Sequence, residues 1–176
     1  DWETFSSASG ITVVSDAVIP VELIQAMFIG MDPPKHDRLK NLFQRGFTPK
    51  RIGEHEEKIR AIRVDVLDRL DGRERCDLVG EVAQPVVSRV IGSFMGIPPE
   101  DDEPWATLLN SLVGFGDPDL NPNGTETIME NQVPLIFDRC RVLIEERRLK
   151  PTDDLTSLLV HAEIDGNGLE EHEIVM

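Results

Sequence analysis

The sequence predicts a mainly α-helical fold, a helical bundle with few and short strands. Apolar residues recur at three- and four-residue intervals through most of the chain, the spacing that aligns them on one face of a helix. Residues that favour helix beginnings, such as Asp, Thr and Pro, precede these periodic segments, and Gly follows several of them. Only residues 76–79 favour a short strand, so the expected strand content is low.

The periodicity places the helices in order along the chain. Residues 11–31 form an apolar, irregular run with Pro20 inside it, which favours a buried connector or a pocket-lining loop. Gly, Asp, Pro and Asn at 115–124 predict a loop, and Pro134 predicts a kink or a later beginning in the helix that follows. A tight turn is expected at 165–168. The expected helices cover residues 33–46, 51–71, 82–96, 101–112, 125–149 and 152–162, with a last one beginning at 170.

Composition limits the class of protein. A chain of 176 residues is expected to form one domain, residues 1–176, and can bury a core. It begins at Asp1 rather than Met, so the natural N-terminus is expected to be missing. No run approaches the roughly 18 apolar residues that span a bilayer, and no signal peptide is evident, so a cytoplasmic protein is expected. A formal net charge of −15 argues against nucleic acid as a partner.

Residues 35–51 are basic within this acidic chain. They hold six Lys or Arg and one acid, whereas the whole chain has 18 basic and 33 acidic residues. Leu39 and Leu42 recur at helical spacing, and His36 and Lys40 are four residues apart, so they are neighbours on a helix. On spacing alone, a mixed-charge amphipathic helix is most often a solvated surface. The concentration of positive charge favours an anionic partner instead.

The order of residues here resembles a known family. Asp-Pro-Pro-x-His-x-Arg-Leu-Lys at 32–40, followed by Gly-Phe-Thr-Pro at 46–49, is similar to the C-helix segment of bacterial cytochromes P-450. Segments 97–102, 114–120 and 153–166 are similar to later parts of the family, in the correct order. The resemblance covers nearly the whole chain, from about the B–C loop to the beginning of the I helix. It is nearest to the branch that acts on methyl-branched lipids, terpenoids and sterols.

The resemblance implies roles for particular residues. In the family, the His of this helix and the basic residue four positions later bind the haem propionates, so these roles fall on His36 and Lys40. The family usually has Arg where this chain has Lys40. Arg can donate two parallel hydrogen bonds to one carboxylate, whereas Lys acts as a point charge. The implied substrate contacts are Phe28, Ile29, Leu112 and Phe115; for the first two, ordinary core packing is an equal alternative. The residues expected to face an acidic electron-transfer protein are Arg38, Arg45 and Lys50.

The residues that carry the family's chemistry are expected to lie beyond this span. That chemistry depends on a Thr-bearing kink of the I helix, a Glu-x-x-Arg pair and a Cys thiolate in a Phe-x-x-Gly loop. Neither Cys76 nor Cys140 lies in such a loop or at metal-ligand spacing, so both are expected to be reduced thiols rather than iron ligands. The haem-ligand half of the fold is therefore expected to be absent, and this chain alone to be inactive.

Residues 119–130 allow a second interpretation. They match the EF-hand calcium pattern D-x-(D/N)-x-(D/N)-G-x5-E at Asp119, Asn121, Asn123, Gly124 and Glu130. The alternative is therefore a non-catalytic helical Ca²⁺-binding or regulatory module. Against it, position eight is acidic where the pattern normally has an aliphatic residue, and there is no second loop to pair with. The acids can instead serve the beginning of the helix that follows.

The leading hypothesis is part of a haem-dependent monooxygenase. By resemblance, the complete enzyme would contain haem b, with the thiolate ligand outside this chain. It would hydroxylate a hydrophobic small molecule, such as a branched lipid, terpenoid or sterol, using O₂ and electrons from a ferredoxin-type donor. It is expected to be a monomer without a membrane span.

Overall fold

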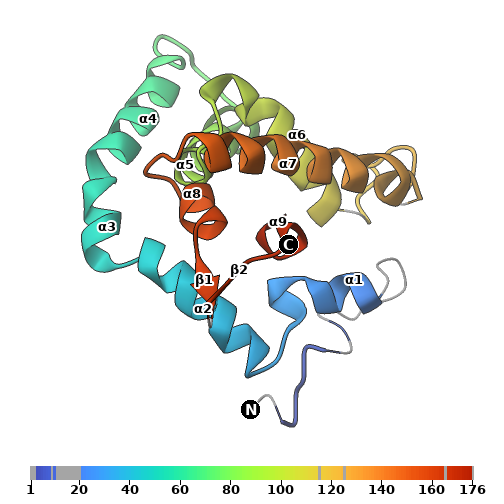
Figure 1. Ribbon diagram of the computed structural model, residues 1–176. Helices are drawn as coiled ribbons and strands as arrows, with labels where there is room; N and C mark the ends of the chain where they lie inside the picture. The colour runs from blue at the N-terminus through green and yellow to red at the C-terminus, as the bar shows by residue number, and fades with distance from the viewer. Residues whose placement is uncertain are drawn as a thin grey trace. The chain divides into compact units, whose positions relative to one another are not determined.

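The molecule is mainly helical in the part that the computed structural model describes, which is residues 3–8, 10, 21–114, 116–124, 126–164 and 166–175. Figure 1 shows the helices and strands in order along the chain. The chain divides into two compact units. Unit 1 holds residues 1–47, 140–151 and 156–176, and unit 2 holds residues 48–139 and 152–155. None of the helices within the described ranges is long and apolar enough to cross a membrane. Residues 11–20 of the expected connector lie outside those ranges.

Unit 1 begins with two helices joined through a 3-10 turn. These are α1 (Val21–Ala26), η2 (Phe28–Gly30) and α2 (Lys35–Gly46). Its later residues add a short antiparallel hairpin, β1 (Glu163–Ile164) with β2 (Asn167–Gly168), and then α9 (Glu171–Val175). The hairpin lies at the expected tight turn. The buried apolar side chains of this unit are Ile24, Met31, Leu39, Leu42, Ile144 and Leu159.

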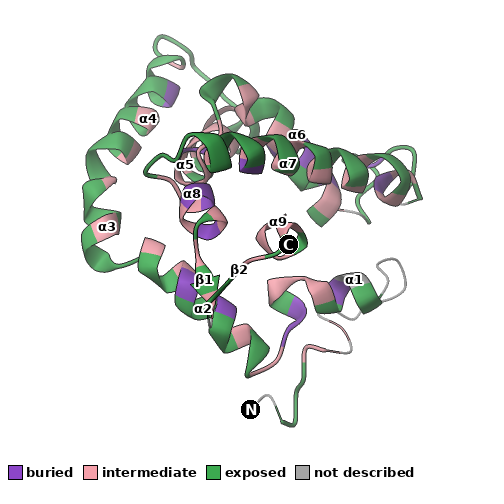
Figure 2. Ribbon diagram, in the orientation of Figure 1, coloured by how far each residue is buried: buried purple, intermediate pink, exposed green. Residues whose placement is uncertain are grey.

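Unit 2 is formed by consecutive helices. In order they are α3 (Pro49–Glu54), α4 (Glu56–Asp68), η3 (Leu78–Ala83), α5 (Gln84–Met95), η4 (Pro99–Asp101), α6 (Asp102–Val113) and η5 (Ile128–Gln132). The long helix α7 (Val133–Leu149) begins in this unit and ends in unit 1, and α8 (Leu155–Val160) follows it. Figure 2 shows α3 and α4 exposed over most of their surface. The buried apolar side chains of unit 2 are Val66, Ala106, Leu108 and Ile128.

Most helix boundaries fall at the residues that the sequence marks. Gly96 directly follows α5, and the turn after α4 contains Gly72, with φ of 80° and 74°, respectively. Glycine adopts this left-handed conformation without strain. Thr48 caps α3 by accepting a hydrogen bond from the Arg51 N–H at 3.3 Å, and Pro49 occupies the first helical position. The helical prediction is therefore confirmed.

The strand expected at 76–79 is wrong. Oδ1 of Asp77 accepts a hydrogen bond from the Val79 N–H at 3.0 Å, and the π-helix η3 follows. Glu81 accepts hydrogen bonds from the guanidinium of Arg73 through both oxygens, and from the Asp77 N–H at 2.7 Å. The Arg73 hydrogen bonds are the main reason that the pKa of the Glu81 carboxyl lies below its ordinary value. These local polar contacts favour a turn over the strand suggested by the apolar residues.

Pro134 was expected either to kink its helix or to make the helix begin later. The structure shows the later beginning. The helix α7 begins at Val133, and the preceding residues 128–132 form the π-helix η5. Proline has no N–H for the carbonyl one turn earlier, so the regular pattern is interrupted before it. A wider turn is one way in which a helix accommodates such an interruption.

A largely buried ion pair links α5 to α6 in unit 2. Nη1 of Arg89 lies 2.9 Å from Oδ1 of Asp102, and each side chain is 17% exposed. Arg89 also donates a hydrogen bond to the Ile97 carbonyl at 2.8 Å. Burial raises the pKa of Asp102, although Arg89 acts in the opposite direction. Gly92 leaves room for the pair, because a Cβ there would lie 2.7 Å from Oδ1 of Asp102.

Gly92→Ala should therefore destabilise unit 2. The added methyl group displaces the Asp102 carboxylate from Arg89, and we expect the free energy of unfolding to fall by about 1–3 kcal/mol in urea titrations. Gly53→Ala in α3 is the matched control, because nothing lies within 4 Å of its Cβ position. The control should be unchanged or slightly more stable. Equal stability of both variants would show that Gly92 does not have this packing role.

Candidate functional site

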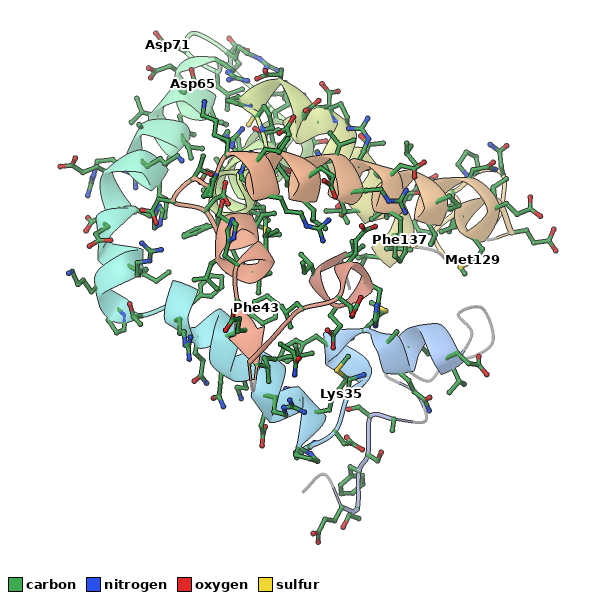
Figure 3. All side chains as sticks on the ribbon, in the orientation of Figure 1. Lys35, Phe43, Asp65, Asp71, Met129 and Phe137 are labelled. Atoms are coloured by element: carbon green, nitrogen blue, oxygen red, sulfur yellow. The ribbon has the colours of Figure 1, made fainter. Side chains whose placement is uncertain are left out.

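The basic helix α2 has one apolar and one polar side. Leu39 and Leu42 are buried, and most of the charged residues of the helix are exposed. Lys35 and Phe43 lie near its beginning and toward its end (Figure 3). Burial of the leucines holds the orientation of the helix in unit 1 and thereby determines which side chains can meet a ligand or partner.

Asp32 connects the beginning of α2 to the N-terminal segment. Its Oδ2 accepts a hydrogen bond from the Ser6 hydroxyl, and its Oδ1 accepts one from the Ser7 N–H at 3.1 Å. These bonds, that of Ser6 most strongly, hold the pKa of the Asp32 carboxyl below its ordinary value. The side chain makes this tertiary connection rather than the helix cap that its position before α2 suggests.

Two neighbours fix the ring of His36. The imidazole stacks on the ring of Phe28, with 4.7 Å between centroids and 8° between planes. Its Nδ1 lies 3.0 Å from Oδ1 of Asp37. An ionised carboxylate can only accept, so Nδ1 carries the hydrogen. The side chain is 28% exposed, and Nε2 makes no hydrogen bond to any residue that the structure describes. Nε2 is therefore the ring atom left for an external ligand.

The other basic residues of this region differ in their surroundings. Lys40 lies one helical turn after His36, is exposed, and makes no side-chain hydrogen bond or ion pair within the described ranges. Arg45 is exposed near the end of α2, and Lys50 is exposed in α3 of unit 2. The ammonium group of Lys40 is thus an available donor for an anion, and Nε2 of His36 becomes one when the ring carries a second hydrogen.

Arg38 lies beside a cavity of about 470 Å³ within unit 1. Lys35 and Arg38 line it from α2. Glu173 lines it from α9, and Glu170, the residue before that helix, also lines it. The remaining lining comes from Pro34, Leu39, Ile164, Asn167, Gly168 and Leu169. The nearby carboxylates reduce the positive potential of Arg38 relative to a basic residue far from any acid.

The expected substrate contacts have different degrees of exposure. Phe28 is half-buried and also contacts the ring of Phe43, with centroids 5.4 Å apart. Ile29, the next residue of η2, is 60% exposed. Leu112 is half-buried near the end of α6. Phe115 lies outside the described residues. Of the three described residues, Phe28 alone stacks on a residue expected to bind the cofactor.

The two cysteines have different environments. Cys76 is exposed, whereas Cys140 in α7 is half-buried. Burial raises the pKa of the Cys140 thiol to about 11. Neither belongs to a group of three or more His, Cys, Asp or Glu side chains that could hold a metal ion, within the described part of the chain.

The EF-hand-like loop is held by hydrogen bonds that a calcium ligand would have to give up. Oδ1 of Asn121 accepts a hydrogen bond from the Ser111 hydroxyl, and its Nδ2 donates to the carbonyls of Ser111 and Gly114 at 2.9 and 2.8 Å. The Asn121 side chain is buried, whereas Asn123 is exposed. The third position of the pattern therefore attaches the loop to α6, which argues against the calcium interpretation.

Sequence reasoning missed the contacts that orient the site. Phe28 and His36 are eight residues apart across a turn, and Ser6 and Asp32 are separated by 26 residues. Helical spacing cannot reveal either pair, because neither shares a helix. The only available signal was an aromatic residue shortly before the Asp-Pro-Pro turn that opens α2.

The geometry defines a mainly α-helical protein with a basic helix, and comparisons with known proteins show what it is similar to. No protein-family model matches the chain. It is 34% identical over 174 residues to a steroid C26-monooxygenase of Mycobacterium tuberculosis, covering 99% of this chain and 45% of that protein. It is also 34% identical over 175 residues to a methyl-branched lipid omega-hydroxylase of Mycobacterium bovis, covering 98% and 40%. The chain thus spans less than half the length of these relatives.

Solved structures show the same relationship. A Mycobacterium marinum cytochrome P-450 in complex with pseudoionone has a TM-score of 0.80 and 33% identity, covering 89% of this chain and 39% of that one. The Bacillus subtilis cytochrome P-450 PksS has a TM-score of 0.76 and 32% identity, covering 88% and 38%. The resemblance predicted from the sequence is confirmed: the chain has part of the bacterial cytochrome P-450 fold.

The family implies a haem group, and the described residues fit one part of it. Nε2 of His36 and the ammonium group of Lys40 are available, one helical turn apart, and both suit a propionate carboxylate when Nε2 carries a hydrogen. Neither Cys76 nor Cys140 lies in the ligand loop of the family. The residues of this chain therefore suit the periphery of haem, and neither of its cysteines fits the thiolate ligand of the iron.

Cys140 should react slowly with thiol reagents. At pH 8, a rise of its pKa from 9.0 to about 11 lowers the thiolate fraction about a hundredfold. The rate with dithionitrobenzoate should rise tenfold per pH unit up to about pH 11. Cys76→Ser isolates Cys140, and Cys140→Ser isolates the exposed Cys76. Comparable rates for the two variants at pH 8 would contradict the buried environment of Cys140.

Asn121→Ala should destabilise unit 2 irrespective of calcium. Loss of its side chain leaves buried groups on Ser111 without their partner, and we expect the free energy of unfolding to fall by about 1–3 kcal/mol. Asn123→Ala, in the same loop but exposed, should change it by less than about 0.5 kcal/mol. Stabilisation of the unchanged chain by 1 mM Ca²⁺, lost in Asn121→Ala, would instead support the EF-hand interpretation.

Proposed function

We propose that the chain is part of a haem-dependent monooxygenase. The observation that carries the proposal is the structure of α2, where Nε2 of His36 and the ammonium group of Lys40 are available one turn apart and the His36 ring is held by Phe28. The sequence identity to a monooxygenase and a hydroxylase over nearly the whole chain supports it. We further propose that residues 1–176 belong to one domain of a monomeric, cytoplasmic enzyme.

His36 and Lys40 would hold the haem propionates. A carboxylate accepts strong hydrogen bonds from an imidazolium N–H and from an ammonium group, and partial burial strengthens the bond to His36. For Nε2 to donate, the ring must carry a second hydrogen, because Nδ1 already donates to Asp37. When bound, haem supplies the oxygen chemistry, and this chain contributes its binding and orientation.

The substrate would be a hydrophobic small molecule, a branched lipid, terpenoid or sterol, hydroxylated with O₂. The names of the two curated relatives, which refer to a steroid and to methyl-branched lipids, support this class. Ile29 is the most exposed of the three described contacts, and its large apolar side chain is 60% exposed. We also propose substrate contacts for Phe28, Leu112 and Phe115.

Electrons would come from a ferredoxin-type donor that meets the basic residues Arg38, Arg45 and Lys50. Their positive charge within a chain of net charge −15 suits an acidic partner. Arg45 and Lys50 are exposed, which suits attraction over a distance. Arg38 should contribute less, because Glu170 and Glu173 line the cavity beside it.

Substitutions should separate haem binding from docking of the donor. In the complete haem-containing protein, His36→Ala should speed haem transfer to apomyoglobin roughly tenfold or more, since a hydrogen bond to a charged group is lost. Arg45→Gln should leave haem transfer unchanged but slow reduction by the donor, and the deficit should shrink as salt rises. Unchanged haem transfer in His36→Ala would refute the propionate role, and a salt-independent deficit in Arg45→Gln would refute the docking role.

A further inference from the structure

We infer that Phe28, besides its proposed contact with substrate, is a positioning residue for His36. Its ring holds the imidazole in the plane from which Nε2 reaches a haem propionate. The inference rests on the proposed haem-binding role of His36 and deepens it, because it names the residue outside α2 on which that role depends.

The geometry of the pair is the first argument. The ring planes differ by 8° and their centroids are 4.7 Å apart, values within the range of favourable aromatic stacking. Stacking restricts rotation of the imidazole about its bond to the chain, a torsion that is otherwise broad for His. The Asp37 carboxylate, 3.0 Å from Nδ1, sets which ring edge faces away. Together the two contacts determine both the plane and the direction of Nε2.

The second argument is that Phe28 is itself held in place. Gly30 is buried, and a Cβ at that position would lie 2.0 Å from the carbonyl oxygen of Ile24, whose side chain is fully buried. The turn η2 therefore packs directly on the backbone of α1. The Phe28 ring also contacts the ring of Phe43 in α2. These contacts limit the motion of the Phe28 ring. Stacking on a ring that is itself restrained limits the motion of the His36 imidazole, whereas stacking on a mobile ring would not.

The third argument is the contrast with the neighbouring residue. Ile29 is 60% exposed and free to meet a ligand, whereas Phe28 is half-buried and turned to α2. Adjacent residues of η2 therefore have different tasks: Ile29 is available to an apolar ligand, and Phe28 orients a cofactor-binding side chain.

Haem transfer from the complete holoprotein to apomyoglobin tests the inference. Phe28→Leu keeps an apolar side chain but removes the stack, and haem loss should become about threefold to tenfold faster. Phe28→Tyr keeps the ring and should restore nearly the original rate, which loss of apolar volume alone would not explain. Phe5→Leu is the control, since it removes an exposed phenylalanine of the same unit.

A double-substitution cycle separates the possible outcomes. If Phe28 acts through His36, adding Phe28→Leu to His36→Ala should not speed haem loss further. Additive effects, or a normal rate in Phe28→Leu when His36→Ala is fast, would overturn the positioning role while leaving the propionate role intact. A normal rate in His36→Ala would overturn both. Thermal unfolding of each variant identifies loss of fold, and a Phe28→Tyr variant that is stable yet as fast as Phe28→Leu would also refute the inference.

Discussion

The candidate site depends on the burial of Leu39 and Leu42 on one side of α2. Two buried leucines one turn apart determine the rotation of the helix about its axis, and this rotation determines the direction of every other side chain on it. The same constraint places Arg38 beside the cavity shared with Glu170 and Glu173, so the basic residues of α2 do not form one uniform charged surface. The run of basic residues in the sequence thus has two environments in the structure: Arg38 lies near carboxylates, whereas Lys40 and Arg45 are exposed.

Contacts from outside the helix complete the site. Phe28 reaches His36 from η2, and Asp32 holds Ser6 and Ser7 against the beginning of α2. Both depend on chain turns rather than on regular helix geometry, and both join segments that the sequence pattern treats as separate. A side chain of His has few restraints of its own, so its usefulness for binding a carboxylate depends on neighbours that limit its rotation.

Unit 2 illustrates the same dependence of polar groups on packing. The Arg89–Asp102 pair requires the absence of a side chain at Gly92, and the Asn121 amide requires the carbonyls at the end of α6. Removing one partner of such a buried group is costly because the other is left without water or a protein partner. The EF-hand sequence pattern therefore did not reveal the structural role of Asn121, whose side-chain oxygen and nitrogen already make hydrogen bonds within the protein.

The sequence by itself determined the helical class, most helix boundaries and the basic segment with His36 and Lys40 four residues apart. These features are local: periodicity, Gly and Pro act within a few residues of one another. Residues 76–79 were predicted wrongly because the hydrogen bonds between Arg73 and Glu81 outweigh a weak strand preference. Only the tertiary structure decided that Phe28 stacks on His36, that Asp32 binds Ser6 and that Arg89 meets Asp102. Those contacts join different elements, and their formation depends on how buried surfaces fit together rather than on spacing along the chain.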